Sequence, residues 1–352
     1  MPASPLSPDQ PIPVRPGEEL NATALQEFLN DHTDIGHIQE IRQFPSGFSN
    51  LTYALTTTAG EFILRRPPFG AKIKSAHDMG REFQVLTGLR PHFPRVPRPV
   101  VFTEDESVLG APFYIMSRLP GVILRAHHAR AGLAPTLLKA LSENMVDQLV
   151  AIHAIDVQSS GLIHLGKPEG YVQRQVTGWV TRYEKSATDV IPEMDRVANW
   201  IQSHIPPSSP ACFLHNDFKY DNVVLDARHL TEIVGVLDWE MATVGDPLMD
   251  LGATLAYWCE AEDAPITRMF NISWLPGNLT RQQVVERYRE KSKRDVGNMA
   301  FYYAFGLFKN AVIAQQIYAR WKAGYSSDPR FGSLIDAVKG LAAQAEHAIH
   351  KS

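Results

Sequence analysis

Residues 215–222 place a carboxylate and an amide at a spacing that suits phosphoryl transfer. They read His-Asn-Asp-Phe-Lys-Tyr-Asp-Asn, which follows the pattern H-x-D-x-x-x-x-N with Asp217 and Asn222 as its polar positions. A second carboxylate, Asp238, lies sixteen residues after Asn222. Phosphoryl transfer needs one carboxylate to accept the proton of the attacking hydroxyl, and an amide and a second carboxylate to hold magnesium on the triphosphate. The pattern therefore predicts Asp217 as the catalytic base and Asn222 and Asp238 as ligands of Mg²⁺.

The sequence between Asn222 and Asp238 predicts a β-hairpin that brings these two residues together. Residues 223–225 are apolar, residues 226–229 have the composition of a turn, and residues 233–237 are largely β-branched and apolar again. Antiparallel pairing would place the two ends of this hairpin side by side. An Asp with an Asn five residues later is on its own usually loop chemistry, with side chains that cap turns. The hairpin and the second carboxylate favour a functional site instead.

Three further polar residues near this pattern are expected to have structural roles. His215 follows the apolar run 211–214 and is expected to be buried, where it supports backbone groups rather than acting as a base. Asp246 precedes Pro247 and most simply N-caps the helix that starts there. Asp250, in the same helix, is expected to cap the catalytic loop.

The amino-terminal half contains a candidate phosphate-binding loop between two strand-like runs. Residues 44–53 read Phe-Pro-Ser-Gly-Phe-Ser-Asn-Leu-Thr-Tyr. Loops of this kind present backbone N–H groups and hydroxyls to phosphate oxygens. The candidate donors are Ser46, Gly47, Ser49 and Asn50. The segment does not follow G-x-G-x-x-G, so an ordinary turn is the alternative interpretation.

A strand-like run over residues 61–65 ends in two arginines that are candidates to bind phosphate. Arg65, with Arg66 as the alternative, can bond a carboxylate and a phosphate at once through its planar fork. The helix that follows has an apolar face at spacings of four and three, formed by Met79, Phe83 and Leu86. Glu82 borders this face, so we expect it to pair with Arg65. A solvated glutamate beside the face is the alternative.

Together these segments resemble the protein-kinase-like fold, and within it the aminoglycoside phosphotransferases and choline kinases. The first loop has H-N-D, where such small-molecule kinases favour H-[GN]-D, and the second has D-W-E rather than the D-F-G of protein kinases. Residues 237–252, LDWEMATVGDPLMDLG, are similar to the aminoglycoside phosphotransferase family throughout. The branch that is most similar is the kinase-like part of certain large acyl-CoA dehydrogenases. The resemblance runs from about Phe44 to Gly252 and is weak beyond.

The resemblance implies an α+β, protein-kinase-like, two-lobed fold that uses ATP or GTP with Mg²⁺. It places Lys219 where it can reach the transferred phosphoryl group, and Arg65 where the family has its phosphate-binding lysine. In the family, the segment that corresponds to residues 111–121 is the hinge, whose backbone pairs with the adenine edge. The residues expected around the base are Met116, Ser117 and Leu119. Met116 and Leu119 would serve equally well as core residues.

Periodicity and composition divide the chain into three parts. Residues 1–19 are rich in proline and are expected to form a flexible tail. Residues 20–118 alternate strand-like runs with a helix and are expected to form a small antiparallel-sheet lobe that binds the nucleotide. Residues 119–352 are mainly helical and contain the catalytic and metal-binding loops.

The composition is that of an ordinary globular enzyme. The 352 residues are 44% hydrophobic and 20% charged, and the net charge of −4 gives no reason to expect a nucleic acid or a membrane surface as partner. The sequence has no apolar stretch long enough to span a bilayer. Cys212 and Cys259 lack metal-ligand spacing and suggest a reducing, cytoplasmic compartment. The sequence does not indicate an oligomeric state.

The phosphate acceptor is expected to be a small hydroxyl compound, and two charged clusters point to different ones. An acidic cluster in the helical part would suit a polycationic aminoglycoside, and consists of Glu260, Glu262 and Asp263. Basic clusters would suit the phosphates of a coenzyme A thioester, and consist of Arg125, His127, His128 and Arg130 and of Arg287, Arg289, Lys291, Lys293 and Arg294. Charge runs of either sign are most often solvated surfaces. The acyl-CoA dehydrogenase branch implies a hydroxyacyl compound or its CoA ester, which we favour.

Two alternatives stay open at this point. One is an aminoglycoside or amino-alcohol kinase. The other is a catalytically silent module that binds a nucleotide or an acyl ligand, which Arg65 and the single-glycine loop would support. The presence of Asp217, Asn222 and Asp238 together argues against such a module, because a scaffold needs none of them.

Overall fold

The computed structural model describes residues 6, 9–45, 50–68, 78–297, 299–325 and 328–350. The chain divides into two compact units. The first, here called the sheet unit, comprises the chain up to Ile123 together with Val223–Ala242. The second, the helical unit, comprises Leu124–Asn222 and Thr243–Ser352.

The hairpin predicted between Asn222 and Asp238 is present, and it belongs to the sheet unit. Strands β7 (Val223–Leu225) and β8 (Ile233–Val236) pair antiparallel, with Val223 opposite Val236. Val122 and Leu225 exchange two backbone hydrogen bonds of 2.9 and 2.8 Å within that unit. The sequence alone places the hairpin in the C-terminal lobe. It does so because the backbone bonds between Val122 and Leu225 join residues that are distant in the chain and give no local sequence signal.

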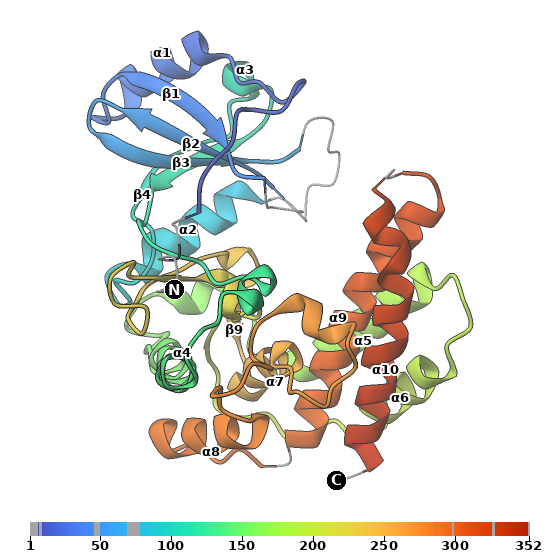
Figure 1. Cartoon of the computed structure of the whole chain (residues 1–352). Coiled ribbons are helices and arrows are strands. Elements are labelled where there is room, and N and C mark those ends of the chain that lie inside the picture. Colours follow the sequence, from blue (N-terminus) through green and yellow to red (C-terminus); the bar gives the residue numbers. More distant parts are fainter. Residues whose placement is uncertain are drawn as a thin grey trace. The chain divides into compact units, whose positions relative to one another are not determined.

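The sheet unit is built on a five-stranded antiparallel sheet with the order β1-β2-β3-β5-β4 (Figure 1). Its strands are β1 (Ile38–Gln43), β2 (Leu51–Thr57), β3 (Gly60–Arg66), β4 (Pro99–Thr103) and β5 (Phe113–Ser117). Its helices are α1 (Ala22–His32), α2 (Met79–Leu89) and α3 (Glu106–Leu109). The antiparallel sheet predicted for the amino-terminal lobe is therefore confirmed.

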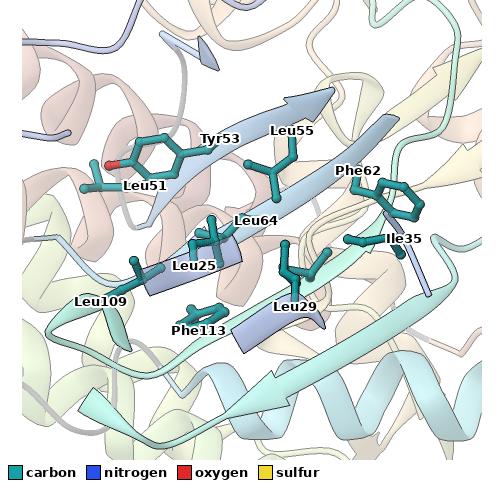
Figure 2. Packing of buried hydrophobic residues seen from close by; sticks show 11 residues of the cluster. Leu25, Leu29, Ile35, Leu51, Tyr53, Leu55, Phe62, Leu64, Leu109 and Phe113 are labelled. Atoms are coloured by element: carbon teal, nitrogen blue, oxygen red, sulfur yellow. The ribbon is translucent and has the colours of Figure 1, made fainter. Parts of the chain in front are cut away.

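Helix α1 covers one face of this sheet and closes a hydrophobic core (Figure 2). Leu25 and Leu29 are four residues apart, so they lie on the same side of the helix. Alternate residues of a strand share a face, and the inward residues of β2 and β3 are Leu51, Tyr53, Leu55, Phe62 and Leu64. The core holds the sheet from which Arg65 projects.

Residues 9–19, which we expected to be part of a flexible tail, are hydrogen-bonded to the sheet unit. Ile12 and Gln43 exchange two backbone hydrogen bonds of 2.8 Å, which extends the edge strand β1. The Tyr53 hydroxyl donates to the Glu18 carbonyl at 2.7 Å. An extended proline-rich segment can satisfy an open strand edge, and this part of the chain does so.

The helical unit contains seven α-helices in its described part, and α9 is central to their packing (Figure 1). The helices are α4 (Pro135–His153), α5 (Tyr171–Ser186), α6 (Pro192–Ser203), α7 (Pro247–Tyr257), α8 (Arg281–Ser292), α9 (Met299–Lys322) and α10 (Leu334–His350). Helix α9 packs against α5, α6, α7 and α10. A short ladder of β6 (Cys212–Leu214) and β9 (Thr243–Gly245) leads into the catalytic loop and into α7. None of the helices that the structure describes has the length and apolarity needed to cross a membrane.

Helices α7 and α9 approach closely because glycines face each other where they cross. A Cβ atom added at Gly252 would lie 2.3 Å from the Tyr302 carbonyl oxygen, and one added at Gly306 would lie 2.4 Å from the Gly252 carbonyl oxygen. No side chain can occupy either position without moving a helix. This contact matters to the site, since α7 also holds the catalytic loop.

Gly252→Ala is expected to destabilise the protein by about 1–3 kcal/mol, because it overpacks this crossing. Gly178→Ala is the matched control in the interior of α5, where the added Cβ would meet only the end of the Arg182 side chain, at 3.2 Å. It should stabilise the protein by roughly 0.5–1 kcal/mol through helix propensity. Urea denaturation of both variants measures the difference, and equal effects would exclude a tight crossing.

Candidate active site

The candidate catalytic loop, residues 215–222 of the helical unit, brings together three residues predicted from the sequence, Asp217, Lys219 and Asn222. The Lys219 ammonium donates to both Asp217 carboxylate oxygens, at 2.9 and 2.8 Å. The Asn222 side-chain amide donates to the Asp217 carbonyl at 2.8 Å and to its Oδ2 atom at 2.9 Å. The amide nitrogen of Asn222 makes both bonds, so Asn222 does not use its amide oxygen to contact Asp217.

The Asp217 carboxylate is kept ionised by the cations around it. Burial alone would raise its pKa, but Lys219, Lys309 and His215 together outweigh burial and lower the pKa below its usual range. A carboxylate in this state is ready to accept a hydrogen bond, and then a proton, from a hydroxyl group.

Asp250 holds the backbone of the catalytic loop from the first turn of α7. Its two carboxylate oxygens accept from the backbone N–H groups of His215 and Asn216, at 2.6 and 2.8 Å. The His153 ring lies 3.1 Å from the same carboxylate. Burial would raise the pKa of Asp250, but His153, His215 and these bonds lower it. The predicted capping role of Asp250 is therefore confirmed.

The other two structural predictions for this region are also confirmed. His215 is fully buried, and its ring nitrogen Nδ1 accepts the backbone N–H of Asp217 at 3.2 Å. Asp246 N-caps α7 by accepting from the Leu248 N–H at 2.9 Å. Both residues support the backbone of the catalytic segment.

Two residues of the helical unit that sequence reasoning missed, Lys309 and Tyr257, also contact this loop. Lys309, from α9, is buried and donates to the Asn216 carbonyl at 2.7 Å. Asn216 has a φ of 65°, a left-handed conformation that asparagine tolerates well. Tyr257, the last residue of α7, places its ring 4.5 Å from the Lys219 ammonium. A lysine inside the apolar run of α9 was the one sequence signal that could have identified Lys309.

In the sheet unit, Arg65 and Glu82 form the predicted ion pair. Arg65 Nη1 lies 2.5 Å from Glu82 Oε1, and the two side chains are 11% and 2% exposed. Arg66 is instead buried on the other side of the strand, where it donates to the Leu109 carbonyl at 2.9 Å. The alternatives of a solvated Glu82 and of Arg66 in the place of Arg65 are therefore wrong.

Arg65 is also surrounded by carboxylates from the segment after β8. Asp238 Oδ1 lies 3.3 Å from Arg65 Nη2, and Glu240 Oε2 lies 3.6 Å from it. Burial alone would lower the pKa of Arg65, but Glu82 and these two carboxylates raise it, so the guanidinium stays charged. Asp238 has a φ of 65°, an uncommon conformation for an aspartate that is typical of functional sites.

Of the four residues predicted to form the phosphate-binding loop, the structure describes only Asn50. Asn50 is buried and donates to Glu240 Oε2 at 3.2 Å, a contact that the sequence did not suggest. Ser46, Gly47 and Ser49 lie outside the described residues.

The predicted hinge residues lie at the end of β5. Met116 is buried opposite Ile63. The Ser117 N–H donates to the Arg98 carbonyl at 2.8 Å, so this group is already used within the sheet unit. Leu119 lies against Gly235 of β8, where an added Cβ would come within 2.3 Å of Leu119 Cδ1. Asn222 and Asp238 stand at the two ends of the hairpin, directly before β7 and two residues after β8.

Glu82→Ala is expected to lower the free energy of unfolding by about 3 kcal/mol, the lower end of the usual cost of breaking a buried ion pair. The cost is near that lower end because Asp238 and Glu240 stay beside Arg65. Glu61→Ala, which removes the 53%-exposed partner of Arg118, is the control and should cost less than about 1 kcal/mol. Urea denaturation followed by fluorescence would show equal losses if the Arg65 pair were only a surface contact.

Residues 40–289 match the phosphotransferase enzyme family, APH, and the chain belongs to this family. The match extends past Gly252, beyond which we had found the resemblance weak. Among curated relatives, acyl-CoA dehydrogenase family member 11 of Rattus norvegicus is 32% identical over 341 residues. These residues are 94% of this chain but 43% of the relative, so the chain spans less than half of that protein.

Solved structures confirm the kinase-like aminoglycoside phosphotransferase fold. A putative aminoglycoside phosphotransferase from Ralstonia eutropha JMP134 is 28% identical, with a TM-score of 0.80 over 95% of this chain and 99% of its own. ADP-bound aminoglycoside phosphotransferase APH(2'')-Ib is 17% identical, with a TM-score of 0.56 over 94% and 99% of the two chains. The second likeness shows the fold alone.

Proposed function

We propose that this protein transfers the γ-phosphoryl group of ATP, or of GTP, to a hydroxyl group of a small molecule. The observation that carries the proposal is the ionised Asp217 carboxylate, held between Lys219 and Asn222 in a chain of the phosphotransferase enzyme family. A structural neighbour of the same fold binds ADP, which supports a nucleotide as the donor.

In the proposed reaction, Asp217 orients the acceptor hydroxyl and takes its proton. The acceptor oxygen forms a bond to the γ-phosphorus, the bond from that phosphorus to the bridging oxygen breaks, and the nucleoside diphosphate leaves. Lys219 offsets negative charge on the transferred group. Both oxygens of Asp217 now accept from Lys219, so Lys219 must release at least one of them before the proton moves.

Asn222 and Asp238 are proposed to hold Mg²⁺ through oxygen atoms. The donor set fits, because an amide oxygen and a carboxylate are ligands that this ion prefers. The amide nitrogen of Asn222 faces Asp217, which leaves its oxygen for the ion. When bound, the ion would neutralise charge on the triphosphate. Arg65 is proposed to bind the phosphates, with Ser49 of the loop.

We further propose an acceptor that carries negative charge, such as a hydroxyacyl compound or its CoA ester. Around Asp217 and Asp221 the helical unit contributes the cations Lys219, Lys309 and Arg125. One carboxylate oxygen of Asp221 is buried with no hydrogen-bond partner. Burial raises the pKa of Asp221, and Arg125 is the cation that most strongly opposes this rise. These cations offset the carboxylates Asp217 and Asp221, so this group lacks the excess of negative charge that a polycationic acceptor would need. The acyl-CoA dehydrogenase names of the curated relatives support the same class.

The acidic cluster that would favour an aminoglycoside is largely neutralised within the helical unit. Arg281 lies 2.8 Å from a Glu260 oxygen and 2.6 Å from an Asp263 oxygen. Part of the second basic cluster is neutralised in the same way, since Arg287 pairs with Asp147 at 2.8 Å. The cations beside Asp217, rather than either surface cluster, therefore support the choice of acceptor.

The test is a nucleotide-consumption screen with ATP and GTP over hydroxy acids, their CoA esters, amino alcohols and aminoglycosides. We expect turnover with the hydroxyacyl class. Turnover only with aminoglycosides or amino alcohols would overturn the acceptor class, and no turnover with any acceptor would leave the silent binding module. The two buried free thiols suit a cytoplasmic setting, so the screen should be run under reducing conditions.

Asp217→Asn should lower kcat by roughly 10²–10⁴-fold, the usual contribution of a general base. The affinity for ATP should change little, because the carboxylate acts on the acceptor and its loss is felt in the transition state. Steady-state kinetics with the acceptor found in the screen, together with calorimetric titration of ATP, measures both quantities. Normal turnover by the variant would remove Asp217 from the chemistry.

Asp238→Asn should weaken the binding of Mg²⁺-ATP, because the variant loses a charged oxygen ligand. Asp226→Asn is the matched control: Asp226 lies in the turn of the same hairpin, where its carboxylate accepts from backbone N–H groups. Calorimetric titration should show a clear loss for the first variant and none for the second. Unchanged affinity in Asp238→Asn would exclude Asp238 as a metal ligand.

A further inference from the structure

Helix α7 presents two residues of one face to the catalytic loop. Asp250 and Tyr257 are seven residues apart, which is close to two helical turns, so their side chains lie on the same side of the helix. Asp250 bonds the loop backbone, as described above. We propose that Tyr257 is the positioning residue for Lys219, whose ammonium its ring holds beside Asp217. The inference rests on the proposed phosphotransferase function.

The contacts of Lys219 define what the ring does. Its ammonium lies 4.5 Å from the Tyr257 ring centroid while it donates to both Asp217 oxygens, at 2.9 and 2.8 Å. The Lys219 side chain is only 19% exposed, so its charge is partly removed from water. A cation near the face of an aromatic ring is attracted by the ring quadrupole, and more strongly when it is desolvated. Lys219 is therefore held between a carboxylate and a ring.

In the proposed reaction, the contact with the Tyr257 ring would stabilise Lys219 while its bonds to Asp217 change. Lys219 must leave at least one Asp217 oxygen when the acceptor hydroxyl arrives, yet it must stay close to the phosphoryl group. A lysine has a flexible stem and a compact charge, so it can pivot about its position. The Tyr257 ring gives this charge a second favourable contact during the pivot. Burial raises the pKa of Tyr257, as do the charge of Asp217 and its hydrogen bond with the Tyr257 hydroxyl, so the phenol stays neutral.

Two substitutions, one that removes the Tyr257 ring and one that removes only its hydroxyl, test the proposal through steady-state kinetics. Tyr257→Leu should lower kcat by roughly 5- to 30-fold, the range expected for loss of a partly desolvated cation–π contact. The KM for ATP should stay nearly constant. Tyr257→Phe keeps the ring but loses the hydroxyl bond to Asp217, so it should restore part of the lost rate. In a Lys219→Met background, Tyr257→Leu should lose no more rate than Tyr257→Phe, because only the hydroxyl bond to Asp217 is left to remove.

A second measurement does not depend on turnover. Limited acylation of amines, read by mass spectrometry, reports how well each lysine is held. Lys219 should react several-fold faster in Tyr257→Leu than in the wild type or in Tyr257→Phe. Exposed Lys139 serves as the internal reference, and buried Lys309 should stay unmodified if the helical unit is intact. If Tyr257→Leu exposes Lys309, Tyr257→Met replaces it as the variant without a ring.

The outcomes separate this inference from the proposed function. Equal acylation of Lys219 in the wild type, Tyr257→Phe and Tyr257→Leu would overturn the positioning role of the ring. Faster acylation of Lys219 in a protein that turns over no acceptor would support the contact between ring and lysine and reject the kinase reaction.

Discussion

The catalytic loop depends on one buried carboxylate. Asp250 is fully buried, yet it is fully used, because two backbone N–H groups and a histidine ring surround it. A buried charge without such partners would be costly. With these partners, Asp250 fixes the backbone that precedes Asp217. Asn216 has a left-handed conformation there, and Lys309 bonds its carbonyl. The close crossing of α7 and α9 keeps both anchors in place.

The sheet unit uses the opposite arrangement, a buried cation among carboxylates. The planar fork of Arg65 reaches Glu82 and Asp238 together. A lysine has a single charged centre and could not span both in the same way. With Glu240 also close, Arg65 is surrounded by negative charge before any nucleotide binds. Under the proposed function, a magnesium ion held by Asp238 would offset part of that excess of negative charge.

The sequence predicts those parts of the site whose signal is local. Asp217 and Asn222 follow a fixed spacing, Asp246 and Asp250 lie just before and just after the proline that starts a helix, and Glu82 borders a clear apolar face. Lys309, Tyr257 and Glu240 were missed because their partners are distant: Lys309 reaches an asparagine 93 residues away. Such residues lie in apolar helices or in a short turn, where their pattern predicts only core or cap. The order of residues 9–19 was missed for a related reason, since a strand edge gives no signal in the segment that covers it.

The two lysines near Asp217 have different electrostatic consequences. Lys309 is buried and donates to the Asn216 carbonyl. Burial lowers the pKa of Lys309 below its usual value, although Asp217 and Asp250 partly oppose that effect. Lys219 is partly exposed and bonded to the carboxylate itself, so its charge can shift toward an incoming anion. If Lys219 moves away in the proposed reaction, Lys309 and His215 still oppose the effect of burial on the pKa of Asp217. Under the proposed function, the fixed lysine would retain its effect on the base while the movable lysine turns to an anionic acceptor.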